Sequence, residues 1–125
     1  MEKLTKKEEE LMQILWQLKK AFVKEIVARY PNPKPHYNTV SSLIRVLQEK
    51  GIVGFNAYGN TYEYYPLLKK EAYRKIYMKE IVSQYFNNSF PSAVAAFVKE
   101  EELDEKEVEE LIKLIQLWRL FLYIY

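Results

Sequence analysis

The chain has 125 residues, of which 49% are hydrophobic and 29% are charged, and its formal net charge is +2. This hydrophobic fraction is too high for a disordered chain, and the length allows one core of ordinary size with an extension. Cysteine is absent, which excludes disulfides and thiolate metal sites and suits a reducing cytoplasm. Met1 is not followed by an apolar stretch, so we expect no secretory signal.

The charge is divided unevenly along the sequence. Residues 1–70 hold twelve Lys or Arg against seven Asp or Glu, a net +5, whereas residues 71–125 hold seven against ten, a net −3. A basic segment attracts a polyanion such as nucleic acid, and an acidic segment is repelled by one. Contact with a polyanion is therefore expected in the first half.

Two helices are predicted at the start of the chain. The first begins at Thr5, with Glu8 placed to complete a capping box, and its buried stripe is Leu11, Met12, Ile14, Leu15, Trp16 and Leu18. The second, shorter helix is terminated by Pro31 and has the apolar stripe Phe22, Val23, Ile26, Val27 and Tyr30. Pro31, Pro33 and Pro35 then fix the path into the next helix, as in a helix-turn-helix with a lengthened turn.

A third helix is predicted from about His36 to Lys50, followed by Gly51 as a helix stop. Its apolar residues recur at helical spacing and form a core face: Val40, Leu43, Ile44 and Leu47. The opposite face carries uncharged hydrogen-bonding side chains around one guanidinium: Asn38, Ser41, Ser42, Arg45 and Gln48. Such a face suits the edges of bases, although an ordinary amphipathic helix can have a similar solvated side.

A β-hairpin is predicted next, with strands from Ile52 to Tyr58 and from Thr61 to Tyr65 around the turn Gly59-Asn60. Pro66 limits the second strand to an edge or to its end. No Lys or Arg occurs from Gly51 through Leu68, so the hairpin offers only polar side chains and backbone donors to a phosphate. Tyr62 and Tyr64 are expected in the core rather than at a contact surface.

Three helices followed by a hairpin have the order of a winged helix, whose third helix enters the major groove of DNA. Arg45 is the candidate for reading guanine or holding a phosphate, and polar residues near the helix N-terminus can bond phosphates or bases. Tyr37 can flank DNA or anchor the helix to the core. The candidate DNA-binding residues are Tyr37, Asn38, Thr39, Ser41, Ser42, Arg45 and Asn60.

Three helices are predicted after the hairpin: Lys69 to about Phe86, Ser92 to Glu100, and a last helix capped by Asp104. From Leu114 onward the last helix is apolar nearly all round, yet it is too short to cross a bilayer. A second copy of the chain is the expected cover, and attachment to a membrane surface is a poorer alternative. The candidate dimerisation residues are Tyr77, Ile81, Phe97, Leu111, Ile115 and Trp118.

The amino-acid composition gives little support for catalysis. His36 is the only histidine and Asp104 is the only aspartate, so neither a catalytic triad nor a histidine-based metal site can be assembled. The three glycines all lie in or beside the hairpin, so no phosphate-binding glycine loop exists. We expect no enzymatic activity, no metal and no small-molecule cofactor.

The chain resembles, in the order and spacing of its motifs, the bacterial family of penicillinase repressors and methicillin-resistance regulators. The motifs are Leu4-Thr5 with Glu8 to Trp16, Tyr37 to Gly51, and Gly59 to Pro66. The segment from Ser89 to Ile115 is similar to that family's dimerisation helices. The resemblance implies a homodimeric winged-helix repressor of a palindromic operator, often ahead of genes for a β-lactamase or a membrane sensor-protease.

Three departures limit this resemblance. The family is typically cleaved at an Asn-Phe bond, where this chain has Ala96-Phe97, so the usual proteolytic induction does not carry over directly. Copper-responsive relatives carry C-terminal cysteines, and this chain has none. A basic residue usually follows the wing glycine, and here that residue is Asn60, which implies a weaker phosphate contact.

The sequence therefore predicts a mostly α protein with a small β-hairpin, built as a winged helix-turn-helix DNA-binding domain over residues 1–68 and a helical dimerisation region over residues 69–125. The predicted partners are a double-stranded DNA operator and a second copy of the chain, with a membrane sensor-protease pathway upstream. The alternative is a winged-helix interaction module that docks a regulatory protein without binding specific DNA.

Overall fold

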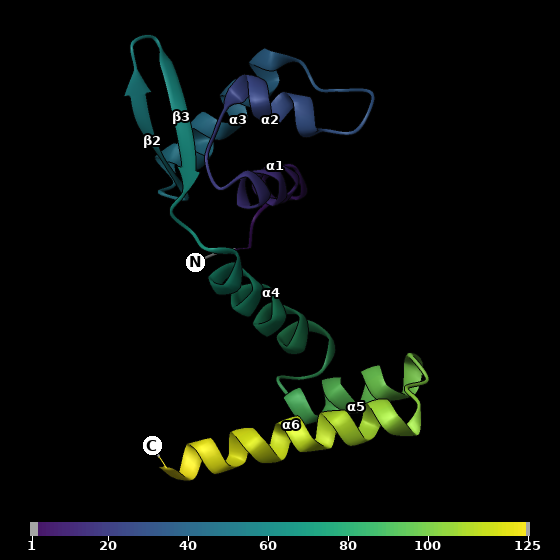
Figure 1. Ribbon diagram of the computed structural model, residues 1–125. Coiled ribbons are helices and arrows are strands. Elements are labelled where there is room, and N and C mark those ends of the chain that lie inside the picture. The colour runs from purple at the N-terminus through teal and green to yellow at the C-terminus, as the bar shows by residue number, and fades with distance from the viewer. Residues whose placement is uncertain (1–2, 125) are drawn as a thin grey trace. The chain divides into compact units, whose positions relative to one another are not determined.

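The computed structural model describes residues 3–124, and the side chains of residues 3–122. The chain divides into two compact units, of which the first ends at Glu80 and the second begins at Ile81. The described residues are mostly helical with one small antiparallel sheet, as Figure 1 shows. The predicted fold class, a winged helix followed by a helical region, is confirmed.

Helix α1 (Lys6–Leu18) begins at the predicted capping box. The Thr5 backbone N–H donates to Oε1 of Glu8 at 2.9 Å, and the Glu8 backbone N–H donates to Oγ1 of Thr5 at 3.2 Å. Two of the free donors at the helix start are satisfied in this way. The buried residues of α1 then include Leu11, Met12 and Leu15, which have no exposed surface.

The second helix is shorter than its apolar stripe suggested. Helix α2 (Val23–Arg29) is preceded by a strand, β1 (Ala21–Phe22), which the sequence did not predict. Phe22 therefore belongs to a strand instead of the helix, because Ala21 and Phe22 pair with Tyr64 and Glu63 of the hairpin. A strand of two residues is too short to show the alternating hydrophobic pattern that predicts a strand, so its pairing with the distant hairpin could not be inferred from the sequence.

Helix α3 (Tyr37–Glu49) ends where the sequence predicted. Nδ1 of His36 accepts a hydrogen bond from the Asn38 backbone N–H at 3.1 Å, which makes His36 the N-cap. Gly51 follows the helix with φ of +75°, a conformation that is costly for a residue with a Cβ atom. The core face of α3 is deeply buried at Val40, Ile44 and Leu47.

The sheet has three strands in the order β1-β3-β2, so the second hairpin strand is its central strand. Strands β2 (Val53–Tyr58) and β3 (Thr61–Pro66) pair antiparallel, with Val53 opposite Pro66 and Tyr58 opposite Thr61. Gly59 at the turn has φ of +63°. Pro66 lies at the end of β3, one of the two positions that its missing N–H allows.

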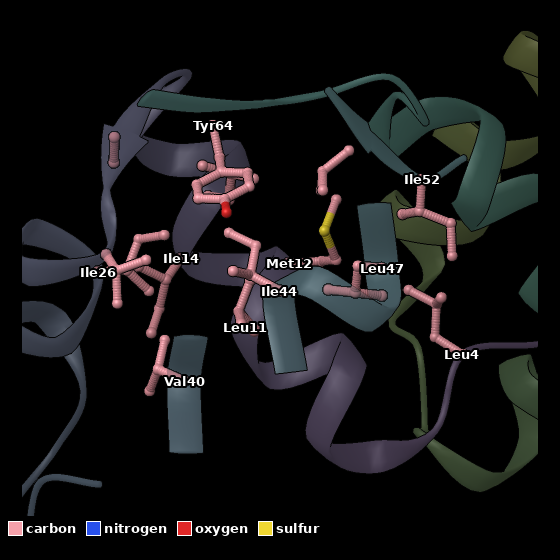
Figure 2. Packing of buried hydrophobic residues seen from close by; sticks show 14 of the residues in the cluster. Leu4, Leu11, Met12, Ile14, Ile26, Val40, Ile44, Leu47, Ile52 and Tyr64 are labelled. Carbon is pink, nitrogen blue, oxygen red and sulfur yellow. The ribbon is translucent and has the colours of Figure 1, made fainter. Parts of the chain in front are cut away.

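The core of the first unit lies between the sheet and helices α1, α2 and α3. Figure 2 shows the Tyr64 ring pointing from the sheet toward Leu11 and Ile44. Tyr64 is 5% exposed, which confirms its predicted place in the core. The other labelled core residues are Leu4, Met12, Ile14, Ile26, Val40, Leu47 and Ile52.

Helix α4 (Lys70–Tyr85) attaches to the first unit through a buried tyrosine. The Tyr73 hydroxyl accepts from the Leu4 backbone N–H and donates to Oε2 of Glu9, both at 3.3 Å. Burial, together with the Glu9 carboxylate, raises the pKa of Tyr73 to about 12, so its hydroxyl keeps its proton. Nearby, the Trp16 indole N–H donates to the Leu68 carbonyl at 2.9 Å.

The second unit contains two further helices, α5 (Phe90–Glu100) and α6 (Glu105–Ile124). The predicted break before α5 is present, because Asn87 and Asn88 both have positive φ and Ser89 caps α5. The Glu107 backbone N–H donates to Oδ1 of Asp104 at 2.8 Å, so the predicted cap of α6 is also present. No helix within residues 3–124 is long and apolar enough to cross a membrane.

Candidate nucleic-acid interface

Helix α3 presents its polar face to solvent because its opposite face is fixed in the core. Asn38, Thr39, Ser42 and Arg45 are exposed, Ser41 is half-buried, and Tyr37 is 52% exposed. The opposite face anchors α3 at residues that are at most 1% exposed: Val40, Ile44 and Leu47. All six α3 residues proposed to bind DNA are therefore on accessible or partly accessible surface of one rigid helix, which can offer several polar groups at once.

The hairpin supplies the seventh candidate, Asn60, which is exposed at the turn beside Gly59. It lies on a different element from the α3 residues. One expectation for the hairpin was wrong, because Tyr62 is 43% exposed and does not belong to the core. Tyr62 and Tyr64 share one face of β3, but Tyr62 lies closer to the hairpin tip, beyond the helices that cover Tyr64.

Arg45 on α3 lies within electrostatic reach of Tyr64 on β3. Burial raises the pKa of Tyr64, the Arg45 guanidinium acts in the opposite direction, and the phenols of Tyr62 and Tyr37 raise it further. These side chains come from α3 and β3. Helix α3 also contacts β2, so the helix and the hairpin are neighbours in the first unit.

An ion pair that no sequence pattern predicted links the start of α1 to the end of α3. Nζ of Lys50 donates to Oε2 of Glu8 at 2.7 Å, while the other oxygen of Glu8 accepts from Thr5. Burial alone would raise the pKa of Glu8, but the hydrogen bonds from Lys50 and Thr5 lower it below its ordinary value of 4.5. Glu8 thus serves a helix cap and also holds the end of α3.

Comparison with known proteins identifies the family of the chain. A sequence profile described as "Penicillinase repressor" matches residues 4–117. The chain belongs to the penicillinase repressor family.

Curated relatives carry matching names. The chain is 28% identical over 103 residues to "Methicillin resistance regulatory protein MecI" of Staphylococcus aureus strain N315, covering 82% of this chain and 84% of that protein. It is 30% identical over 103 residues to "Penicillinase repressor" of Staphylococcus aureus, covering 82% of each. It is 20% identical over 112 residues to "Penicillinase repressor" of Bacillus licheniformis, covering 86% of this chain and 84% of that protein.

The penicillinase repressor family consists of transcriptional repressors, which regulate transcription by binding DNA and not by catalysis. The resemblance drawn from the sequence is therefore confirmed. Within residues 3–124, no group of three or more His, Cys, Asp or Glu side chains could hold a metal ion.

The six residues proposed for dimerisation of this chain differ in how exposed their side chains are. Phe97, Ile115 and Trp118 are 62%, 55% and 62% exposed, so an apolar surface is open on α5 and α6. The remaining three are half-buried within the single chain: Tyr77, Ile81 and Leu111. Tyr77 packs against the core of the first unit, with its ring centroid 6.1 Å from that of Tyr73.

Proposed function

We propose that this member of the family acts as a homodimer on a palindromic operator in double-stranded DNA, in the cytoplasm. The observation that carries this proposal is the exposed polar face of α3 around Arg45, held on a helix whose other face is buried. The major groove admits an α-helix and displays a distinct pattern of donors and acceptors for each base pair. Two copies of α3 would read two half-sites of one duplex.

A contact between Arg45 and a base or phosphate can be tested with DNA selected from a random pool by the full-length protein. Removal of a bidentate arginine contact costs roughly 1–3 kcal/mol, so Arg45→Ala should weaken binding by about five- to 150-fold. Arg74→Ala is the matched control, because Arg74 is exposed on α4 and its loss changes the net charge equally. Equal affinities of Arg45→Ala and the unchanged protein would contradict the assignment.

Homodimerisation is supported by the exposed apolar side chains of α6. Seven large hydrophobic side chains in this helix are each at least 51% exposed: Leu114, Ile115, Leu117, Trp118, Leu120, Phe121 and Leu122. Contiguous apolar surface on this scale marks an interaction site, and two-fold dimers are the commonest solution among oligomers. A second copy would also place two α3 helices on one DNA molecule and raise the effective concentration of the second contact.

Sedimentation equilibrium of the full-length protein tests this interface. The unchanged protein should be dimeric at micromolar concentration, and Leu117→Glu combined with Leu120→Glu should be monomeric, because carboxylates would have to be buried without partners. Lys113→Glu adds a carboxylate to the same helix without removing an apolar side chain, so this control should remain dimeric. A monomeric unchanged protein would refute the proposal.

The names of the relatives support a regulon of β-lactam resistance genes. A membrane sensor-protease would then provide the inducing signal, although Ala96-Phe97 replaces the cleavage site usual in the family. Exposure of the protein to such a protease, followed by mass spectrometry, would locate any cleaved bond. An intact chain under conditions that cleave a susceptible relative would exclude this route of induction.

A docking module for a regulatory protein is the second candidate, and the exposed aromatic side chains of the hairpin favour it, with Tyr58 at 57% and Tyr62 at 43% exposure. The two functions differ in their dependence on salt. DNA affinity falls steeply with added salt because bound counterions are released, whereas an aromatic protein contact responds weakly. Affinity for the selected DNA at several salt concentrations therefore separates them.

A further inference from the structure

The wing, formed by β2 and β3, faces an electrostatic problem as a DNA-binding element. It contains no Lys or Arg between Gly51 and Leu68, and its one charged residue is Glu63. A wing without cations cannot neutralise phosphates, and a carboxylate directed at DNA would repel it. Any contact between this wing and DNA must therefore come from neutral groups, with Glu63 kept away from the phosphates.

The strand register separates the carboxylate from one face of the wing. Successive side chains of a strand point to opposite faces. Phe55 lies opposite Tyr64 and Ala57 lies opposite Tyr62, so these residues share the face that enters the core at Tyr64. Glu63 lies opposite Asn56 on the other face, together with Tyr58 and Thr61. The core-side face therefore carries no charge along the length of the hairpin.

Two aromatic side chains occupy the exposed outer part of this neutral face. The ring centroids of Phe55 and Tyr62 are 4.5 Å apart, and these residues are 36% and 43% exposed. The Tyr62 ring also contacts Tyr64 edge-on, with centroids 6.3 Å apart. Tyr62 is thus held between one exposed ring and one buried ring.

Helix α3 contacts β2, the strand that carries Phe55, so α3 and the hairpin are neighbours. Tyr64, the next residue after Tyr62 on the same face of β3, lies within electrostatic reach of Arg45 and Tyr37 on α3. Because the hairpin lies beside α3, a duplex whose groove holds α3 would bring its sugar-phosphate backbone near the hairpin. Tyrosine hydroxyls are among the groups that donate hydrogen bonds to phosphate oxygens.

We propose that Tyr62, supported by Phe55, is a backbone contact of the wing, with its hydroxyl donating a hydrogen bond to a DNA phosphate oxygen. This inference rests on the proposed DNA-binding function and adds a residue that the sequence had assigned to the core. The contact orients the wing on the duplex without neutralising a phosphate. Its contribution to affinity is therefore insensitive to salt, unlike that of a lysine or arginine.

The variant Tyr62→Phe removes only the hydroxyl and keeps the ring against Phe55. Loss of one hydrogen bond to a charged acceptor should weaken binding about tenfold, while the slope of log affinity against log salt stays unchanged. Tyr58→Phe is the matched control, because Tyr58 is a similarly exposed tyrosine on the opposite face of the same hairpin. Its affinity should equal that of the unchanged protein.

A second variant, Tyr62→Lys, tests the same position with a cation. A lysine that reaches the phosphate should steepen the salt slope by about 0.9, the value for one neutralised phosphate. Binding is measured by fluorescence anisotropy on DNA selected by the unchanged full-length protein. Thermal unfolding by circular dichroism establishes that each variant is folded.

Three results would overturn the inference: unchanged affinity of Tyr62→Phe, an equal loss in Tyr58→Phe, or an unchanged salt slope in Tyr62→Lys. The Arg45→Ala variant shows whether a negative result concerns only the Tyr62 contact or the proposed DNA-binding function as a whole. If Arg45→Ala weakens binding and Tyr62→Phe does not, only the wing contact is wrong. If neither substitution affects binding, the α3 assignment itself fails.

Discussion

Substitution of Glu8 tests whether the ion pair between α1 and α3 stabilises the winged helix. Glu8→Gln keeps an amide oxygen for the Thr5 backbone N–H but removes the charge that binds Lys50. The side chain of Glu8 is 4% exposed and that of Lys50 is 50% exposed. A charged hydrogen bond contributes about 1.5–3 kcal/mol, and screening at the half-exposed lysine reduces the expected loss to about 1–2 kcal/mol.

Removal of the other partner should cost at least as much. Lys50→Met leaves a buried carboxylate that retains only the Thr5 hydrogen bond, which is more unfavourable than a neutral amide at the same place. The double variant should therefore be more stable than the sum of the single losses predicts. Urea unfolding, followed by circular dichroism at one protein concentration, measures all three changes in the free energy of unfolding.

The pH dependence of the free energy of unfolding shows whether the charge of Glu8 stabilises the protein. The pKa of Glu8 in the folded protein is below its ordinary value of 4.5. A carboxyl with a lowered pKa adds stability above that ordinary value and loses it as the pH falls through the folded-state pKa. The difference in unfolding free energy between the unchanged protein and Glu8→Gln should thus be constant from neutral pH down to the ordinary pKa and shrink below it.

Two results would refute this reasoning. One is equal stability of Glu8→Gln and the unchanged protein at neutral pH. The other is a stability difference that does not change with acidification, which would mean that Glu8 acts through its shape and the Thr5 cap alone.

Two further substitutions test the core and the attachment of α4. Ile44→Ala should lower the free energy of unfolding by about 2–5 kcal/mol, because Ile44 has no exposed surface, whereas Val46→Ala on the same helix should change it by less than about 0.5 kcal/mol. Equal effects of the two would show that the core face of α3 is misassigned. Trp16→Phe removes the indole donor to Leu68 and should cost about 1 kcal/mol, measured by thermal or urea unfolding with circular dichroism; an unchanged midpoint would exclude a role for this hydrogen bond.

The sequence was sufficient for features that depend on a few neighbouring residues. The capping box of Thr5 and Glu8, the stop at Gly51 and the turn at Gly59 were all predicted and are present. Each is a local contact or a local backbone conformation, so its residues lie within a few positions of one another. The two faces of α3 were predictable for a similar reason, because helical spacing decides which residues share a face.

Tertiary structure decided what depends on distant segments. Strand β1 exists because Ala21 and Phe22 pair with β3, and no local pattern marks such a short strand. Glu8 and Lys50 are 42 positions apart, so the second role of a residue already assigned to a helix cap could not be inferred from spacing.

Tyr62 is the instructive case for the candidate site. Its spacing from Tyr64 correctly placed both on one face of β3, but only one of them is buried. The alternation of a strand determines which side chains share a face, whereas burial depends on how far the covering helices extend along that strand. That extent is a property of the packed molecule, and it decides that Tyr64 supports the core while Tyr62 is left available for a partner.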